Sequence, residues 1–138
     1  MIEVKDLSKK FDELVVLDHV SFTVPEAKLV VILGPSGTGK TVLLKSIIGL
    51  SALDEGEVFI DGQSVQKADH KHLYELRKKI GFVFQQFNLL ARTSALENVM
   101  LPLTYAGVSG KDRHDRAMKA LARVGLAQRT HHAPNELS

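Results

Sequence analysis

The residues best suited to chemistry lie between Gly34 and Thr41, where the chain reads GPSGTGKT. This run matches the phosphate-binding pattern G-x-x-x-x-G-K-[ST] at every fixed position. Glycines allow positive φ angles and let backbone amides approach phosphate oxygens without a Cβ in the way. Lys40 offers a positive charge for the β- and γ-phosphates of a nucleotide, and Thr41 offers a hydroxyl ligand for Mg²⁺. The candidate residues of this site are Gly34, Pro35, Ser36, Gly37, Thr38, Gly39, Lys40, Thr41 and the adjacent Val42.

The segments on both sides of this loop have the patterns that a phosphate loop requires. Residues 28–33, KLVVIL, form a continuous apolar run that predicts a fully buried strand. After the loop, apolar residues at positions 43, 44, 47, 48 and 50 predict a helix that ends near Gly49. The N-terminus of such a helix adds a partial positive charge beside bound phosphates. The alternative, a glycine-rich turn that matches by chance, does not account for a strand before the loop and a helix after it.

The rest of the chain combines strand and helix patterns up to about residue 88 and reads as helical beyond it. In the first part we predict strands at residues 2–7, 20–24, 56–65 and 80–84 and a helix at residues 69–79. Turns are predicted at Asp12-Glu13 and at Asp61-Gly62. In the second part, helices are predicted at 93–106 and 111–125, with AGVSGKD connecting them. The change in pattern predicts a separate helical lobe.

Composition excludes several classes of protein. The 138 residues fit one ordinary domain, and the net charge of +2 is spread along the chain, so we expect no nucleic-acid binding. The absence of cysteine excludes disulfides and thiolate metal sites, and the six histidines lack the spacing of a metal site. We see no signal peptide and no apolar run of about 18 residues, the length of a membrane helix. We therefore expect a cytoplasmic protein without a membrane span of its own.

The motifs together resemble those of the ATP-binding subunits of ATP-binding cassette (ABC) transporters. The resemblance is carried by Phe11, the loop Gly34–Thr41, IGFVFQQFNLL at 80–90, SALENVMLPL at 94–103 and the terminal PNELS. It points to the branches for lipoprotein release and macrolide export and, in the loop, to the branch for lipid-asymmetry transport. The implied fold is α/β, a P-loop NTPase core with an N-terminal antiparallel β subdomain and the start of a helical subdomain. Residues 1–88 would form the core with the β subdomain, and residues 89–138 the partial helical subdomain.

The resemblance assigns roles to single residues. Phe11 matches the aromatic residue that stacks on adenine, although packing at a strand end is the plain alternative. Val16 matches an apolar position near the nucleotide and reads equally well as an ordinary strand residue. Gln85 matches the glutamine that reaches Mg²⁺ or the attacking water, so Lys40 and Gln85 are the candidate catalytic residues and Thr41 and Gln85 the candidate Mg²⁺ ligands. Val42 departs from the family's common threonine, which removes one neutral hydrogen bond to the nucleotide.

The last residues, PNELS, resemble the start of the family's signature motif, which would continue as GGQ. In the family this motif binds the γ-phosphate of an ATP held by the opposite subunit, so Ser138 is a candidate contact in trans. We therefore expect a fragment without the acidic strand, catalytic glutamate and switch histidine, inactive in hydrolysis by itself. The strands that separate 28–33 from 80–84 in the family's sheet would also be absent, so we expect exposed apolar faces and poor folding.

The function implied by the resemblance is that of an ATPase engine. Two subunits would meet head to tail, bind and hydrolyse Mg-ATP, and drive a transmembrane permease that carries a lipid, lipoprotein or small-molecule cargo. The protein would lie in the cytoplasm on the inner face of the cell membrane. The alternative is a nucleotide-binding remnant or regulatory module without turnover. A P-loop kinase or GTPase is a weaker alternative, because it leaves Phe11, Gln85 and the terminal Leu-Ser unexplained.

Overall fold

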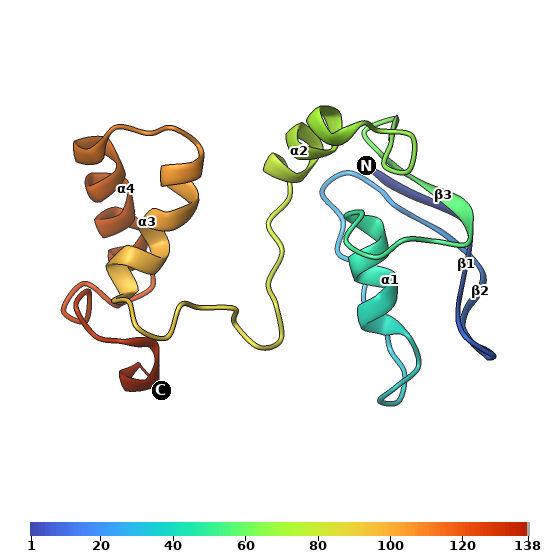
Figure 1. Cartoon of the computed structure of the whole chain (residues 1–138), viewed down its shortest axis with the longest axis horizontal. Coiled ribbons are helices and arrows are strands. Elements are labelled where there is room, and N and C mark those ends of the chain that lie inside the picture. The colour runs from blue at the N-terminus through green and yellow to red at the C-terminus, as the bar shows by residue number, and fades with distance from the viewer. Residues whose placement is uncertain (138) are drawn as a thin grey trace. The chain divides into compact units, whose positions relative to one another are not determined.

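The computed structural model describes residues 1–137 and divides into two compact units, Met1–Phe82 and Val83–Ser138. The first unit contains a four-stranded antiparallel sheet with the order β2-β1-β3-β4 (Figure 1). Its strands are β1 (Ile2–Phe11), β2 (Leu14–Val24), β3 (Glu55–Ile60) and β4 (Gln63–Ser64). The predicted turns are confirmed, because β1 meets β2 across Asp12-Glu13 and β3 meets β4 across Asp61-Gly62. The predicted N-terminal antiparallel sheet is thus present.

The hairpin of β1 and β2 contains an irregularity that the sequence pattern does not reveal. The register of β1 against β2 shifts between Val4 and Leu7, and both of these side chains are buried although they are three residues apart. Such a shift marks a β-bulge, which lets an extra residue enter one strand. Asp6, between them, has a φ of 55°, and His19 on the partner strand has a φ of 49°. The bulge therefore changes which β1 side chains face the core.

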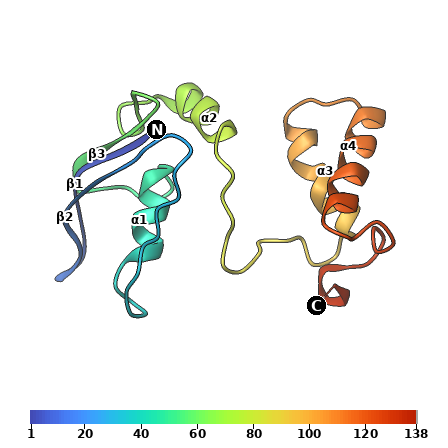
Figure 2. The same cartoon turned by 180° about the vertical axis from the view of Figure 1, so that it is seen from behind.

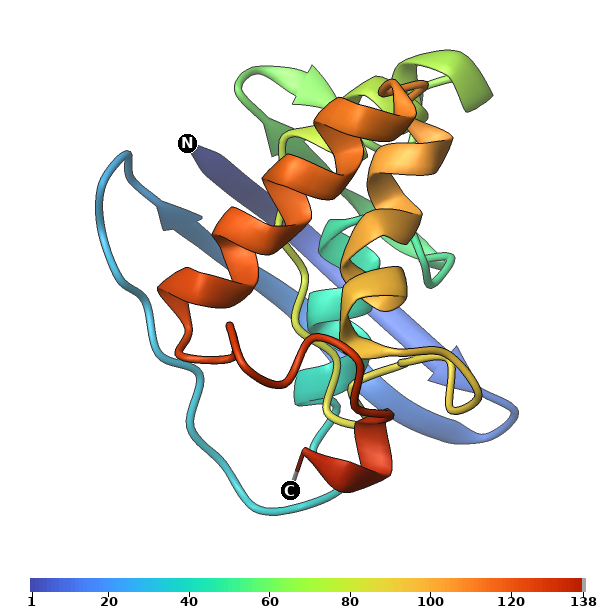
Figure 3. The ribbon, with the colours of Figure 1, turned by 90° about the vertical axis from the view of Figure 1, so that its left-hand side faces the viewer.

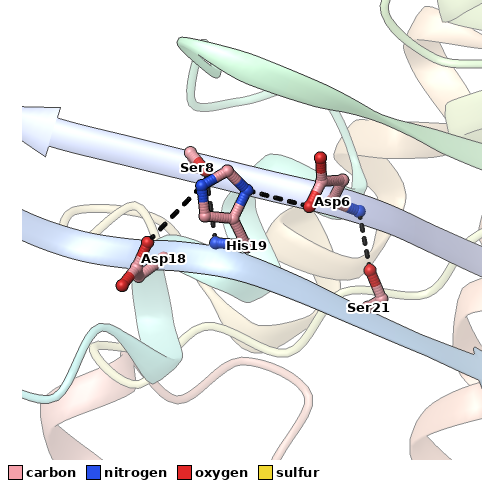
Figure 4. A network of polar contacts seen from close by, with 5 residues as sticks. All are labelled: Asp6, Ser8, Asp18, His19 and Ser21. Atoms are coloured by element: carbon pink, nitrogen blue, oxygen red, sulfur yellow. Dashed lines mark hydrogen bonds and ion pairs between the residues drawn. The ribbon is translucent and has the colours of Figure 1, made fainter.

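Polar side chains tie the two strands together at this bulge (Figure 4). The Nδ1 atom of His19 lies 2.9 Å from Oδ1 of Asp6, and its backbone N–H donates to Oγ of Ser8 at 3.2 Å. The N–H of Asp6 donates to Oγ of Ser21 at 2.8 Å. The hydrogen bond and charge of Asp6 raise the pKa of His19 above its ordinary value. These contacts link β1 and β2 where Asp6 and His19 have left-handed backbone conformations.

Two helices complete the first unit, α1 (Lys40–Ile47) and α2 (His70–Lys78). Leu43 and Ile47 of α1 and Leu76 of α2 belong to one apolar cluster with the sheet residues Val4, Leu7 and Val58. The guanidinium of Arg77 links the helices, because Nε donates to the carbonyl of Ile48 at 2.9 Å and one terminal nitrogen to that of Gly49 at 2.7 Å. These carbonyls follow the last turn of α1, so Arg77 fixes its C-terminal end.

The second unit is built on the helices α3 (Ala95–Tyr105) and α4 (Gly110–Arg123), which lie side by side (Figure 2). Ser94 and Glu97 form a capping box at the start of α3. Leu96 of α3 and Ala117 and Leu121 of α4 form a second, smaller apolar cluster. A short 3₁₀ helix, η1 (Pro134–Glu136), follows. The two helices predicted at 93–106 and 111–125 are confirmed within a few residues.

The prediction of buried strands at 28–33 and 80–84 is wrong. Among residues 1–137 neither segment belongs to a sheet, and Figure 3 draws the segment between β2 and α1 as a plain tube. Leu33 is 87% exposed and Val83 is 92% exposed. An apolar run becomes a buried strand only where other strands pair with both of its edges, and no strand of the described residues does so here. The expected exposure of apolar side chains is therefore confirmed at both segments.

Among the described residues, no helix has the length and apolar character needed to cross a membrane.

Candidate nucleotide-binding site

The loop from Gly34 to Lys40 leads directly into α1, as the sequence predicts. Gly37 and Gly39 have φ angles of 83° and 86°, in the left-handed region that favours glycine. Gly39 is the N-cap residue of α1, and no side chain caps the helix. The first helical hydrogen bond runs from the N–H of Leu43 to the carbonyl of Gly39 at 2.8 Å. The amides of the first turn, Lys40 to Val42, therefore have no partner within the helix and can bind an anion.

The side chain of Lys40 folds back over the loop. Its Nζ atom donates to the carbonyl of Gly34 at 2.8 Å and to that of Pro35, and it lies 3.5 Å from Oγ1 of Thr38. Within residues 1–137, no carboxylate forms an ion pair with Lys40. The ammonium is thus held at the loop by neutral carbonyls alone, and its charge is not compensated. An uncompensated cation next to uncapped amides is suited to a phosphate chain.

The loop is packed closely against strand β2 at one point. A Cβ added to Gly39 would lie 2.7 Å from the carbonyl oxygen of Val16 and 2.8 Å from its Cγ1. Only glycine leaves room for this contact, which positions the N-terminus of α1 against the sheet. The structure therefore brings Val16 to the loop, where the resemblance expects it. Its contact with a nucleotide stays a prediction.

A cavity of about 420 Å³ opens beside the loop. It lies between the loop, β2 and the segment before the loop. The residues that line it are Val16, Leu17, Asp18, Val20, Ile32, Leu33, Gly34, Pro35, Thr38, Gly39, Lys40 and Leu43. Asp18 is a carboxylate that belongs to no sequence motif. Its position two residues after Val16 on the same strand would have placed both side chains on one face of an ideal strand.

Phe11 lies at the end of β1, before the hairpin turn, and does not line this cavity. The residue is 48% exposed, so the alternative of simple core packing does not describe it. The ammonium of Lys9 lies over the ring, 5.2 Å from its centroid. Lys9 matches no sequence motif, although its two-residue spacing from Phe11 along a strand indicates a shared face. The role of Phe11 in stacking on adenine stays a prediction.

Gln85 belongs to the second unit, where it forms a turn with Gln86. The N–H of Phe87 donates to the carbonyl of Phe84 at 3.2 Å across this turn. The position of Gln85 relative to the phosphate loop is not described, so its catalytic and metal-binding roles stay predictions. Ser138, the candidate contact in trans, lies outside the described residues.

The donor set of the loop fits a magnesium nucleotide. In the described part of the chain, no group of three His, Cys, Asp or Glu side chains is arranged to hold a metal. Mg²⁺ does not need such a group, because it binds one or two protein ligands and takes the remainder from phosphates and water. Thr41 is exposed in the first turn of α1, and its hydroxyl as a Mg²⁺ ligand stays a prediction.

Comparison with known proteins agrees with this geometry. The family model described as ABC transporter matches residues 17–138. An uncharacterized ABC transporter ATP-binding protein of Thermotoga maritima is 46% identical over this whole chain and 61% of its own length. The lipoprotein-releasing system ATP-binding protein LolD of Bacteroides thetaiotaomicron is also 46% identical, over the whole chain and 64% of its length.

A solved structure shares the fold. It is the dimeric, post-hydrolysis state of the ATP-binding cassette MJ0796 bound to ADP and Pi, and it matches with a TM-score of 0.87 and 40% identity. The match covers all of this chain and 63% of that one. The chain thus spans somewhat less than two thirds of the length of these three proteins, and it has the fold of the corresponding part of an ATP-binding cassette. The loop, the fold and these matches together show that the chain belongs to the ABC transporter family.

Proposed function

We propose that this chain is the nucleotide-binding part of an ABC transporter ATP-binding subunit and that it binds Mg-ATP at the loop Gly34–Thr41. The observation that carries the proposal is the uncapped N-terminus of α1 next to Lys40, whose charge no carboxylate of the described residues compensates. The matching structure MJ0796 is described as bound to ADP and Pi, which supports a nucleotide as the ligand.

Each residue of the loop has a physical task in this proposal. The amides of the first turn of α1 bind phosphate oxygens, helped by the partial positive charge of the helix N-terminus. Lys40 exchanges its carbonyl partners for the β- and γ-phosphates, which are stronger acceptors because they are charged. Thr41 provides the hydroxyl that ligates Mg²⁺, and the bound ion neutralises phosphate charge. Lys40 thereby orients the phosphate chain and stabilises its negative charge.

The remaining roles rest on the family match. Gln85 is proposed to ligate Mg²⁺ or to orient the attacking water, a task for which a neutral amide is suited. Phe11, Val16 and Val42 are proposed to contact the nucleotide, and Ser138 the γ-phosphate held by a second subunit. A head-to-tail dimer, a transmembrane permease as partner and a place on the inner face of the cell membrane complete the proposal. The name of the LolD relative favours a lipoprotein or lipid cargo.

A binding titration tests this proposal. Isothermal titration of the purified chain with Mg-ATP should give saturable binding, with folding checked by circular dichroism. Lys40→Ala removes a charge-assisted contact and should weaken binding roughly ten- to a hundred-fold. Lys45→Ala is the matched control, because it removes an equal charge from the last turn of the same helix. Equal weakening by both variants, or no binding of ATP at millimolar concentration, would contradict the proposal.

Phosphate release, measured in parallel, addresses turnover. We expect no steady hydrolysis by this chain alone. Hydrolysis that Lys40→Ala abolishes would show that expectation to be wrong while supporting the site. Binding of Mg-ATP without release of phosphate agrees with the proposal. Adding the permease and a second ATPase subunit then distinguishes a module without turnover from a subunit that hydrolyses ATP.

A further inference from the structure

We infer that Lys9 is a positioning residue for nucleotide binding, which holds the ring of Phe11 in place for an adenine base. This inference rests on the proposed function, because it names a residue that acts through Phe11 at the same site. The ammonium of Lys9 lies 5.2 Å from the centroid of the Phe11 ring, within the range of a cation–π interaction. Both residues belong to the end of β1 that precedes the hairpin turn (Figure 1).

The ammonium is fixed in this position by a carboxylate from another part of the chain. Nζ of Lys9 donates to Oδ1 of Asp54 at 2.7 Å. The other oxygen of Asp54, Oδ2, accepts the backbone N–H of Lys10 at 2.6 Å, and the N–H of Asp54 donates to the carbonyl of Ser8 at 3.1 Å. Asp54 is therefore bound to β1 at three points. The Lys9 side chain is only 14% exposed, unlike most lysines, because it is packed between Asp54 and the ring.

Phe11 keeps exposed surface that a ligand can reach. Lys9 covers one face of Phe11, and yet nearly half of the residue remains exposed. A flat base is an appropriate partner for an exposed aromatic ring, and stacking does not need a hydroxyl. The cation draws electron density from the ring, which reduces its repulsion of a stacked base. Because the ring is already held in one orientation, less conformational freedom is lost when the base binds.

The chain contains a matched control for this contact. Lys5, on the same strand, lies over the ring of Phe59 at 4.5 Å and pairs with Glu3 at 3.0 Å. It has the same charge and the same type of ring contact, but Phe59 has no proposed role in binding. Lys5→Met therefore removes one charge and one cation–π interaction from β1 without touching Phe11 or its neighbours.

The experiment compares Mg-ATP with Mg-tripolyphosphate, which has the phosphate chain but no base. Dissociation constants are measured for the chain and for the variants Lys9→Met, Lys9→Arg, Asp54→Asn, Lys5→Met and Phe11→Ala. Lys9→Met should weaken Mg-ATP binding about two- to five-fold, as expected for one cation–π contact at a partly exposed ring, and leave tripolyphosphate binding unchanged. Lys9→Arg should restore affinity, Asp54→Asn should give a smaller loss of ATP affinity, and Phe11→Ala the largest. Lys5→Met should change neither ligand.

The outcomes separate this inference from the proposed function. Equal loss of both ligands in Lys9→Met would mean that Lys9 acts through overall charge or folding, and unchanged ATP affinity would mean that it does not position the ring. Either result overturns the inference. If Lys9→Met fails to fold, Asp54→Asn decides the case, because this variant keeps Lys9 and weakens the hydrogen bond that holds its ammonium. If the unmodified chain binds neither ligand, the proposed function falls, and this inference falls with it.

Discussion

The close packing of Gly39 against Val16 allows a quantitative prediction about the phosphate loop. An added Cβ at Gly39 would lie 2.7 Å from the carbonyl oxygen of Val16, a backbone atom of β2 that cannot rotate away. Gly39→Ala also places an alanine at a φ of 86°, which costs roughly 1–2 kcal/mol for an L-residue. Overpacking against fixed neighbours adds about 1–3 kcal/mol. The free energy of unfolding of the first unit should therefore fall by about 2–5 kcal/mol, a large fraction of the 5–15 kcal/mol typical of domains.

Urea unfolding followed by circular dichroism measures this loss, and Gly62→Ala separates its two causes. Gly62 has a φ of 77° and no atom within 4 Å of the added Cβ, so this variant should show the backbone strain alone. The difference between the two variants isolates the close approach of the loop to β2. Gly39→Ala should also weaken Mg-ATP binding, because α1 must move away from the strand. Equal losses in the two variants would refute the reasoning.

Two further predictions concern the elements that support the site. His19 has a pKa raised by the hydrogen bond and charge of Asp6, so its protonated form stabilises the fold. This stabilisation is complete below the unfolded pKa of about 6.5 and is lost as pH rises through the higher folded pKa. The midpoint of urea unfolding should therefore fall from pH 6 to pH 8. In His19→Asn this midpoint should fall less over the same pH range. An equal decline in both proteins would exclude His19 as its cause. Arg77→Met should cost about 1.5–3 kcal/mol of unfolding free energy, because two part-buried carbonyls at the end of α1 lose charged donors. In thermal unfolding, Lys71→Met on the same helix is the control, and a similar loss there would argue against this role of Arg77.

The sequence by itself determined the features that depend on local chemistry. The phosphate loop, the two strand turns and the helices of both units follow from residue types at short spacings, and the structure has each of them. These features are set by the backbone freedom of glycine and by helical periodicity, both of which act within a few residues. The P-loop motif was therefore readable without knowledge of the tertiary structure.

Only the tertiary structure decided which distant residues meet. The approach of Val16 to Gly39, the hydrogen bond of Asp54 to Lys9 and the bulge at Asp6 and His19 join residues 13 to 45 positions apart in the sequence, and no short pattern encodes them. The apolar run at 28–33 is the opposite case, because its composition indicated a buried strand while burial depended on partner strands. Hydrophobic burial and strand pairing depend on residues that are neighbours in space. A sequence pattern indicates that a segment needs such neighbours, but it does not show whether the fold places them there.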